Sequence, residues 1–115
     1  MMDRIDRISE EMKKEVSAII QNELKDPRVP KFVSVTSADV TKDLRYAKVY
    51  VSVLGSEEDK KNALEGLKSA AGFIRREAGQ RLQLRYAPEL YFELDNSIER
   101  GVYITKLIND TLQGK

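Results

Sequence analysis

The sequence has 115 residues, of which 41% are hydrophobic and 34% charged, a balance typical of a single globular domain. It contains no cysteine and no histidine, which excludes disulfides, thiol chemistry, ordinary zinc sites and imidazole acid–base catalysis. Hydrophobic residues never run beyond three in a row, so neither a membrane span nor a signal-peptide core is expected. We therefore expect one domain over residues 1–115, located in the cytoplasm.

The first half of the chain predicts a helix followed by a hairpin. Hydrophobic residues recur at every third or fourth position from Asp3 to Leu24, which indicates an amphipathic helix. That helix must end before Pro27, because the residue preceding a proline avoids the helical region. Two alternating, β-branched runs at 32–40 and 45–54 then predict a hairpin. In the second strand, the small and branched side chains should point to one face. The opposite face should carry Tyr46, Lys48, Tyr50 and Ser52.

The middle of the chain predicts a helical segment interrupted by glycine. Ser56 followed by three acidic residues marks a helix start, and helical spacing continues to Leu82. A glycine inside a helix costs roughly 1 kcal/mol relative to alanine, and this segment contains Gly66, Gly72 and Gly79. The sequence therefore favours a pair of helices with a kink at Ala70, Ala71 and Gly72.

The last part of the chain predicts a third strand and a short terminal helix. The strand covers Pro88 to Leu94, because Leu90, Phe92 and Leu94 alternate with polar and aromatic residues. Asn96 and Glu99 resemble a capping box, and the helix after them would present Ile104, Leu107, Ile108, Thr111 and Leu112. The expected fold class is α+β, with the order α-β-β-α-α-β and a short C-terminal helix. Helices would cover one face of a three-stranded sheet whose second and third strands are parallel and adjacent.

Charge is unevenly distributed along the chain. The formal net charge is +1. Residues 60–85 nevertheless hold seven basic and two acidic residues, and residues 28–48 hold five basic and two acidic residues. Such segregation favours one positive face opposite an acidic one. The alternative is basic and acidic groups interspersed over the whole surface.

The basic residues of the central segment and the hairpin are candidate phosphate ligands. Lys61, Lys68 and Arg75 are seven residues apart and would form one stripe along a helix. Lys48 shares a strand face with two tyrosines, an arrangement that could pair phosphates while a ring stacks on an unpaired base. The alternative is a solvated sheet face with ordinary tyrosine packing. The hairpin candidates are Lys42, Arg45 and Lys48.

Four cations of the first helix are further candidates: Arg4, Arg7, Lys13 and Lys14. They alternate with acidic residues, so intrahelical ion pairs are the alternative to ligand binding.

Sequence signatures of enzymes are absent. The glycine spacing matches neither a dinucleotide fingerprint nor a P-loop, and no carboxylate lies in an apolar context that would raise its pKa. Asp39 and Asp95 lie at strand ends, where aspartate typically forms turns. We therefore expect no catalytic activity, cofactor or metal.

Several segments, in order along nearly the whole chain, resemble the ribosome-binding factor A family: 25–28 (Lys-Asp-Pro-Arg), 43–51, 72–75 (Gly-Phe-Ile-Arg), 84–90 and 95–98. The resemblance implies a type II KH-like fold. It also implies a role in maturation of the small (30S) ribosomal subunit, including rRNA processing and growth at low temperature, through contact with 16S rRNA. In that family a kinked Ala-x-Gly replaces the Gly-x-x-Gly loop of other KH domains, and Ala70-Ala71-Gly72 stands at that position.

Together these observations predict a non-catalytic KH-like RNA-binding domain. A kink at Gly72 would let the backbone approach RNA, while phosphates are contacted by Lys42, Arg45, Lys48, Lys61, Lys68, Arg75 and Arg76. We expect a monomer with no membrane association, and assembly GTPases are candidate partners. The alternative is a protein-interaction module that docks an acidic partner. A small hydrolase or transferase would need a pocket of convergent carboxylates, which the sequence does not indicate.

Overall fold

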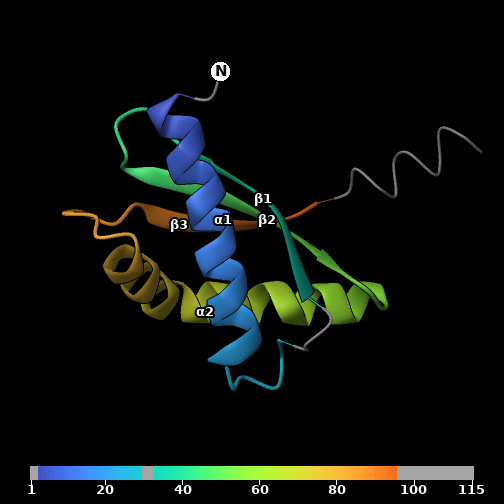
Figure 1. Cartoon of the computed structure of the whole chain (residues 1–115). Coiled ribbons are helices and arrows are strands. Elements are labelled where there is room, and N and C mark those ends of the chain that lie inside the picture. The colour runs from blue at the N-terminus through green and yellow to red at the C-terminus, as the bar shows by residue number, and fades with distance from the viewer. Residues whose placement is uncertain (1–2, 30–32, 96–115) are drawn as a thin grey trace, which may run out of the picture.

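The computed structural model describes residues 3–29 and 33–95 (Figure 1). Along the chain it contains α1 (Arg4–Asn22), β1 (Val33–Val40), β2 (Tyr46–Val53), α2 (Glu57–Arg81) and β3 (Glu89–Leu94). The fold class is α+β, as the sequence predicts. The expected C-terminal helix with Ile104 and Leu112 lies outside the described residues.

Helix α1 is held against the first strand by its hydrophobic stripe and by two polar side chains. Asp3 caps the helix, accepting a hydrogen bond from the Asp6 amide at 2.9 Å. The Ser9 hydroxyl accepts from the Val40 amide at 3.0 Å, and the Gln21 side-chain amide donates to the Val33 carbonyl at 2.7 Å. These bonds engage both ends of β1, while the face between them is buried through Ile8, Met12, Val16, Ile19 and Ile20.

The three strands form a mixed sheet in the order β1-β2-β3. Strands β1 and β2 are antiparallel, and β2 and β3 are parallel neighbours, which confirms the expected pairing. The alternation in β2 is also confirmed, because Ala47, Val49 and Val51 are fully buried while Tyr46 and Lys48 are exposed. Both helices lie on one side of the sheet (Figure 1) and share one hydrophobic core with it.

Helix α2 differs from the expected helix pair, because it is one continuous helix from Glu57 to Arg81. Its start is as predicted: Ser56 and Asp59 form a reciprocal capping box. Figure 1 shows that the ribbon of α2 changes direction toward its C-terminal end, so the helix bends without being interrupted. Ala70 and Ala71 pack against the core, whereas Gly72 is exposed.

Close packing at two glycines explains why the helix tolerates them. A Cβ atom placed on Gly66 would lie 2.6 Å from Cγ2 of Val29, and one on Gly79 would lie 2.7 Å from Cβ of Ala87. These positions let α2 approach the segments on either side of it, and that packing offsets the low helix propensity of glycine. A Cβ on Gly72 would meet no atom within 4 Å, so Gly72 is not needed for packing within the described chain.

This difference predicts opposite effects for two Gly→Ala substitutions in the same helix. Gly72→Ala should raise the Tm by a few degrees, because alanine favours the helix by about 0.4–1 kcal/mol and meets no steric barrier. Gly79→Ala should lower the Tm, because the loop at Ala87 must move, and overpacking typically costs about 1–3 kcal/mol. The double variant Gly79→Ala/Ala87→Gly should restore most of the stability. Thermal melts followed by circular dichroism measure all three; equal effects at positions 72 and 79 would contradict this packing.

Candidate nucleic-acid interface

The cationic stripe predicted on α2 is exposed. Lys61, Lys68 and Arg75 are all on the solvent side of the helix. Within the described residues neither lysine forms an ion pair, whereas the Arg75 Nε donates to the Ala87 carbonyl at 3.0 Å. Arg76 is also exposed, with its guanidinium 6.0 Å from the centroid of the Phe73 ring. Arg75 is therefore tied to the loop after α2, while the two lysines extend a positive edge along the helix.

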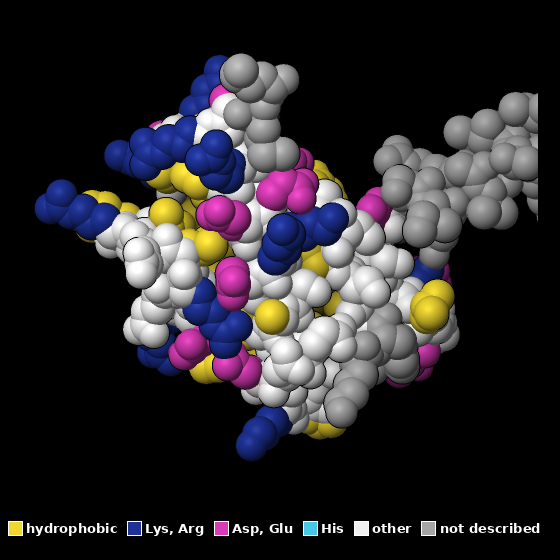
Figure 2. Space-filling view, in the orientation of Figure 1, with side chains coloured by type: hydrophobic (Ala, Val, Ile, Leu, Met, Phe, Trp, Pro, Cys, Tyr) yellow, Lys and Arg dark blue, Asp and Glu magenta, His cyan; other side chains and the backbone are white. Residues whose placement is uncertain are grey.

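The four cations of α1 do not form the intrahelical pairs that the sequence offered as an alternative. None of Arg4, Arg7, Lys13 and Lys14 forms an ion pair with another described residue. The acidic side chain of Glu15 instead contacts Arg81 of α2 at 3.5 Å. Figure 2 shows Lys and Arg side chains gathered over the start of α1 and the neighbouring β1–β2 turn, with another at the tip of the α2–β3 loop.

The open face of the sheet carries tyrosines, but its lysine is neutralised. The rings of Tyr46 and Tyr91 lie 5.9 Å apart between centroids and are tilted by 44°. Lys48 pairs with Glu93 of β3 at 3.8 Å, and Asp39 of β1 is its cross-strand neighbour. Burial raises the pKa of Tyr91 above its ordinary value, and Glu89 adds to the shift. This face therefore agrees better with ordinary cross-strand packing of tyrosines than with a positively charged binding surface.

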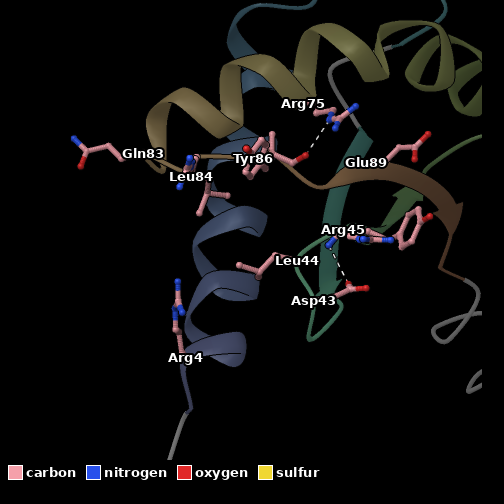
Figure 3. A pocket seen from close by; sticks show the side chains of 12 residues that line it. Arg4, Asp43, Leu44, Arg45, Arg75, Gln83, Leu84, Tyr86 and Glu89 are labelled. Carbon is pink, nitrogen blue, oxygen red and sulfur yellow. Dashed lines mark hydrogen bonds between the residues drawn. The ribbon is translucent and has the colours of Figure 1, made fainter.

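A cleft forms where the start of α1, the β1–β2 turn and the α2–β3 loop meet (Figure 3). Its volume is ≈ 660 Å³. Its floor includes the hydrophobic side chains of Leu44 and Leu84, which pack against the core. Four arginines line it, each from a different segment of the chain: Arg4, Arg45, Arg75 and Arg85. The cleft therefore gathers guanidinium groups that are far apart in the sequence.

The two loops that border the cleft are fixed by hydrogen bonds. In the turn, Leu44 adopts a left-handed backbone with φ of 61°, and its amide donates to the Thr41 carbonyl at 2.9 Å. In the other loop, the Leu84 amide donates to the Gly79 carbonyl at 3.0 Å. The Glu89 amide donates to the Arg45 carbonyl at 2.8 Å and so joins the two loops. The positions of Arg45 and of residues 84–87 are thus determined by the backbone.

Asp43 stabilises the turn that carries Arg45. Its carboxylate accepts hydrogen bonds from the Thr41 hydroxyl at 2.6 Å and from the Arg45 amide at 3.1 Å. The Thr41 hydroxyl, and after it the Arg45 amide, hold the pKa of Asp43 below its ordinary value of 3.8. Asp43 lines the cleft, with its carboxylate hydrogen-bonded within the turn.

The structure separates the predicted site residues into groups. Arg4, Arg45 and Arg75 line one cleft, Lys61 and Lys68 lie along α2, and Lys48 lies on the open sheet face. Lys42 is exposed in the β1–β2 turn. The segment at Ala70, Ala71 and Gly72 does not line the cleft.

Sequence reasoning missed two residues of the cleft, Arg85 and Tyr86. Tyr86 is 75% exposed, and the Arg85 guanidinium lies 5.6 Å from the centroid of its ring. An arginine followed by a tyrosine in a loop before a proline was the available signal. Conversely, Arg81, which belongs to the basic segment, has a structural role, because it bridges Glu15 of α1 and Glu23, the residue that follows the helix.

Within residues 3–29 and 33–95, no cluster of acidic side chains could hold a metal ion. No helix in these ranges is long and apolar enough to cross a membrane.

The mixed three-stranded sheet and the α-β-β-α-β order define a small α+β domain, the fold class expected from the KH-like resemblance. The chain belongs to the ribosome-binding factor A family, whose model matches residues 4–108. It is 76% identical over 110 residues to ribosome-binding factor A of Acetivibrio thermocellus, an alignment that covers 96% of this chain and 89% of that protein.

Two structural comparisons agree with this assignment. The solution structure of a putative ribosome-binding factor A from Thermotoga maritima is 38% identical, with a TM-score of 0.71, and the match covers 86% of this chain and 96% of that one. A Thermus thermophilus ribosome-binding factor A model, fitted into a cryo-electron microscopy map of its complex with the 30S subunit, is 26% identical. Its TM-score is 0.64, with 76% of this chain and 91% of that one covered.

The hydrogen bonds of Asp43 predict a pH-dependent contribution to stability. Because its pKa is lower in the folded than in the unfolded chain, the carboxylate stabilises the fold above the ordinary value of 3.8 and loses this contribution as pH falls through the folded pKa. The Tm of the wild type should therefore exceed that of Asp43→Asn by a constant amount well above pH 3.8, and the difference should shrink as the pH falls below that value. Thermal melts across this range measure it.

Asp39→Asn is the control, because Asp39 is exposed and accepts no described side-chain hydrogen bond. Its Tm difference from the wild type should change less with pH. A difference for Asp43→Asn that persists undiminished at the acid end would contradict the role of the ionised carboxylate.

Proposed function

We propose that this protein is a non-catalytic assembly factor that binds 16S rRNA in the immature 30S subunit and assists its maturation. The observation that carries the proposal is the cleft itself, which Arg4, Arg45, Arg75 and Arg85 line on a nearly neutral protein. Family membership and the complex formed by the Thermus thermophilus relative support the small subunit as the partner.

Binding would depend on phosphate contacts and RNA shape more than on base sequence. Guanidinium groups bind phosphate oxygens strongly because their N–H donors match that geometry. Lys61 and Lys68 would extend the contact along α2, and Lys42, Arg7, Lys13, Lys14 and Arg76 would add positive charge around it. Lys48, which pairs with Glu93 on the open sheet face, would contribute little. No bond would be made or broken. The factor would act by differential affinity, holding an immature rRNA arrangement and leaving when the mature one competes.

The wider setting follows from the same proposal. A factor of this kind would work as a monomer in the cytoplasm, without cofactor or membrane contact. It would support rRNA processing and growth at low temperature, where misfolded RNA arrangements are slow to rearrange. Assembly GTPases are the candidate partners for its release.

Charge reversal at the cleft tests the proposal. Arg4→Glu and Arg45→Glu remove side chains that form no described ion pair, so folding should be preserved. We expect the double variant to bind immature small-subunit particles at least about tenfold more weakly. Its log–log salt slope should fall by roughly 0.7–0.9 for each phosphate that the variant no longer neutralises. Filter binding across a salt series measures both quantities.

Lys25→Glu is the control for each single reversal, Arg4→Glu or Arg45→Glu, because it makes the same charge change as either one in an exposed side chain beyond the other end of α1. This control should leave the particle affinity and the salt slope nearly unchanged. A separate variant, Lys61→Glu/Lys68→Glu, shows whether the RNA also binds along α2. Equal effects of the cleft and control variants would exclude the cleft as the binding site. Particle binding that survives ribonuclease treatment would favour the alternative of docking to an acidic protein.

Gly72 provides a separate test of backbone approach to RNA. A side chain at this position meets no described protein atom, so Gly72→Val should change the Tm by only a few degrees. If RNA approaches the backbone there, the valine should weaken particle binding several-fold, and Gly72→Ala should weaken it less. Unchanged binding by Gly72→Val would remove this position from the interface.

A further inference from the structure

Tyr86 is exposed in a way that packing does not explain. It is 75% exposed, more than Tyr46 at 43% or Tyr91 at 47%, whose rings pack against each other. Tyr86 lies in the short loop between α2 and β3, on the rim of the arginine-lined cleft (Figure 3). An exposed aromatic ring beside several guanidinium groups is the arrangement by which proteins bind unpaired bases.

The loop that carries the ring is ordered on both sides. Before Tyr86, the Leu84 amide donates to the Gly79 carbonyl. After it, the Ala87 carbonyl accepts from Arg75, Pro88 is buried, and the Glu89 amide donates to the Arg45 carbonyl. The backbone of the loop is therefore fixed before any ligand arrives, which lowers the entropy cost of binding.

Arg85 occupies one face of the Tyr86 ring. The cleft also offers hydrogen-bond donors for phosphate groups. The Arg85 guanidinium lies 5.6 Å from the centroid of the Tyr86 ring, in cation–π range. Arg75 uses Nε for the Ala87 carbonyl, so its two terminal NH₂ groups remain for a phosphate. The Arg45 side chain forms no described ion pair. The cleft volume of ≈ 660 Å³ lies within the range of small-molecule pockets.

We infer that this cleft binds a single unstacked nucleotide within an RNA strand, with its base on the Tyr86 ring and the flanking phosphates on Arg45 and Arg75. The inference rests on the proposed function and specifies the ligand of that site. Recognition is tolerant of base identity, because every base has an aromatic face that can stack on the Tyr86 ring. Purines should bind somewhat better than pyrimidines because they stack more strongly.

The test uses the full chain and a five-nucleotide RNA with 2-aminopurine at its centre, a fluorescent base that stacking quenches. The wild type should quench it saturably. Tyr86→Ala should weaken binding between about 5- and 150-fold and abolish the quenching. Tyr86→Phe should stay within about twofold, because stacking needs the ring and not the hydroxyl. Tyr91→Ala, at a tyrosine of the open sheet face, is the matched control and should also stay within about twofold.

The outcomes separate this inference from the proposed function. Absence of quenching by the wild type, or equal binding by Tyr86→Ala, overturns the nucleotide pocket. Equal binding of free adenosine monophosphate also overturns it, since that ligand lacks the second phosphate. If Arg4→Glu/Arg45→Glu weakens binding to small-subunit particles while Tyr86→Ala does not, the proposed function stands and the pocket fails. If neither variant affects particle binding, the proposed function fails as well.

Discussion

The approach of helix α2 to the chain on either side of it determines where the candidate site lies. Gly66 brings the helix against the segment that follows α1, and Gly79 brings it against the loop that leads to β3. Because neither position has room for a side chain, the loop must lie directly on the end of the helix. Arg75 bonds the same loop at Ala87. The loop in turn bonds the β1–β2 turn through Glu89 and Arg45, and the cleft is the space these contacts leave.

A nearly neutral chain produces a positive site because the fold uses its charges unequally. Several cations are engaged in ion pairs within the protein: Arg81 bridges to the α1 region, Lys48 pairs with Glu93 across two strands, and Arg28 pairs with Asp26 of the same loop at 2.7 Å. The Asp26 carboxylate, whose pKa Arg28 lowers, is occupied in the same way. The arginines of the cleft rim form no described ion pair, so their charge is available to an anionic ligand.

The structure also separates two regions that the KH-like interpretation of the sequence treats as one site. The Ala70-Ala71-Gly72 position lies within a continuous helix and offers open backbone, whereas the α2 side of the arginine cleft is formed by Arg75 and by the loop that follows the helix. An RNA strand that contacts both would run along α2, past Lys68 and Arg75, toward Tyr86. This path would engage the lysines of α2 and the arginines of the cleft, but not Lys48 on the open sheet face.

The sequence alone determined most of the secondary structure, because strand alternation and helix caps depend on local spacing. The handedness of crossovers then predicted that β2 and β3 are parallel neighbours. Alternation in β2, the capping residues Asp3 and Ser56, and Pro27 set the elements to within a few residues. Propensity failed at Gly66 and Gly79, where tertiary contact offsets a local cost and keeps α2 unbroken. Only the tertiary structure decided which cations meet, since Arg4, Arg45, Arg75 and Arg85 belong to four segments, and spacing along a chain carries no information about such contacts.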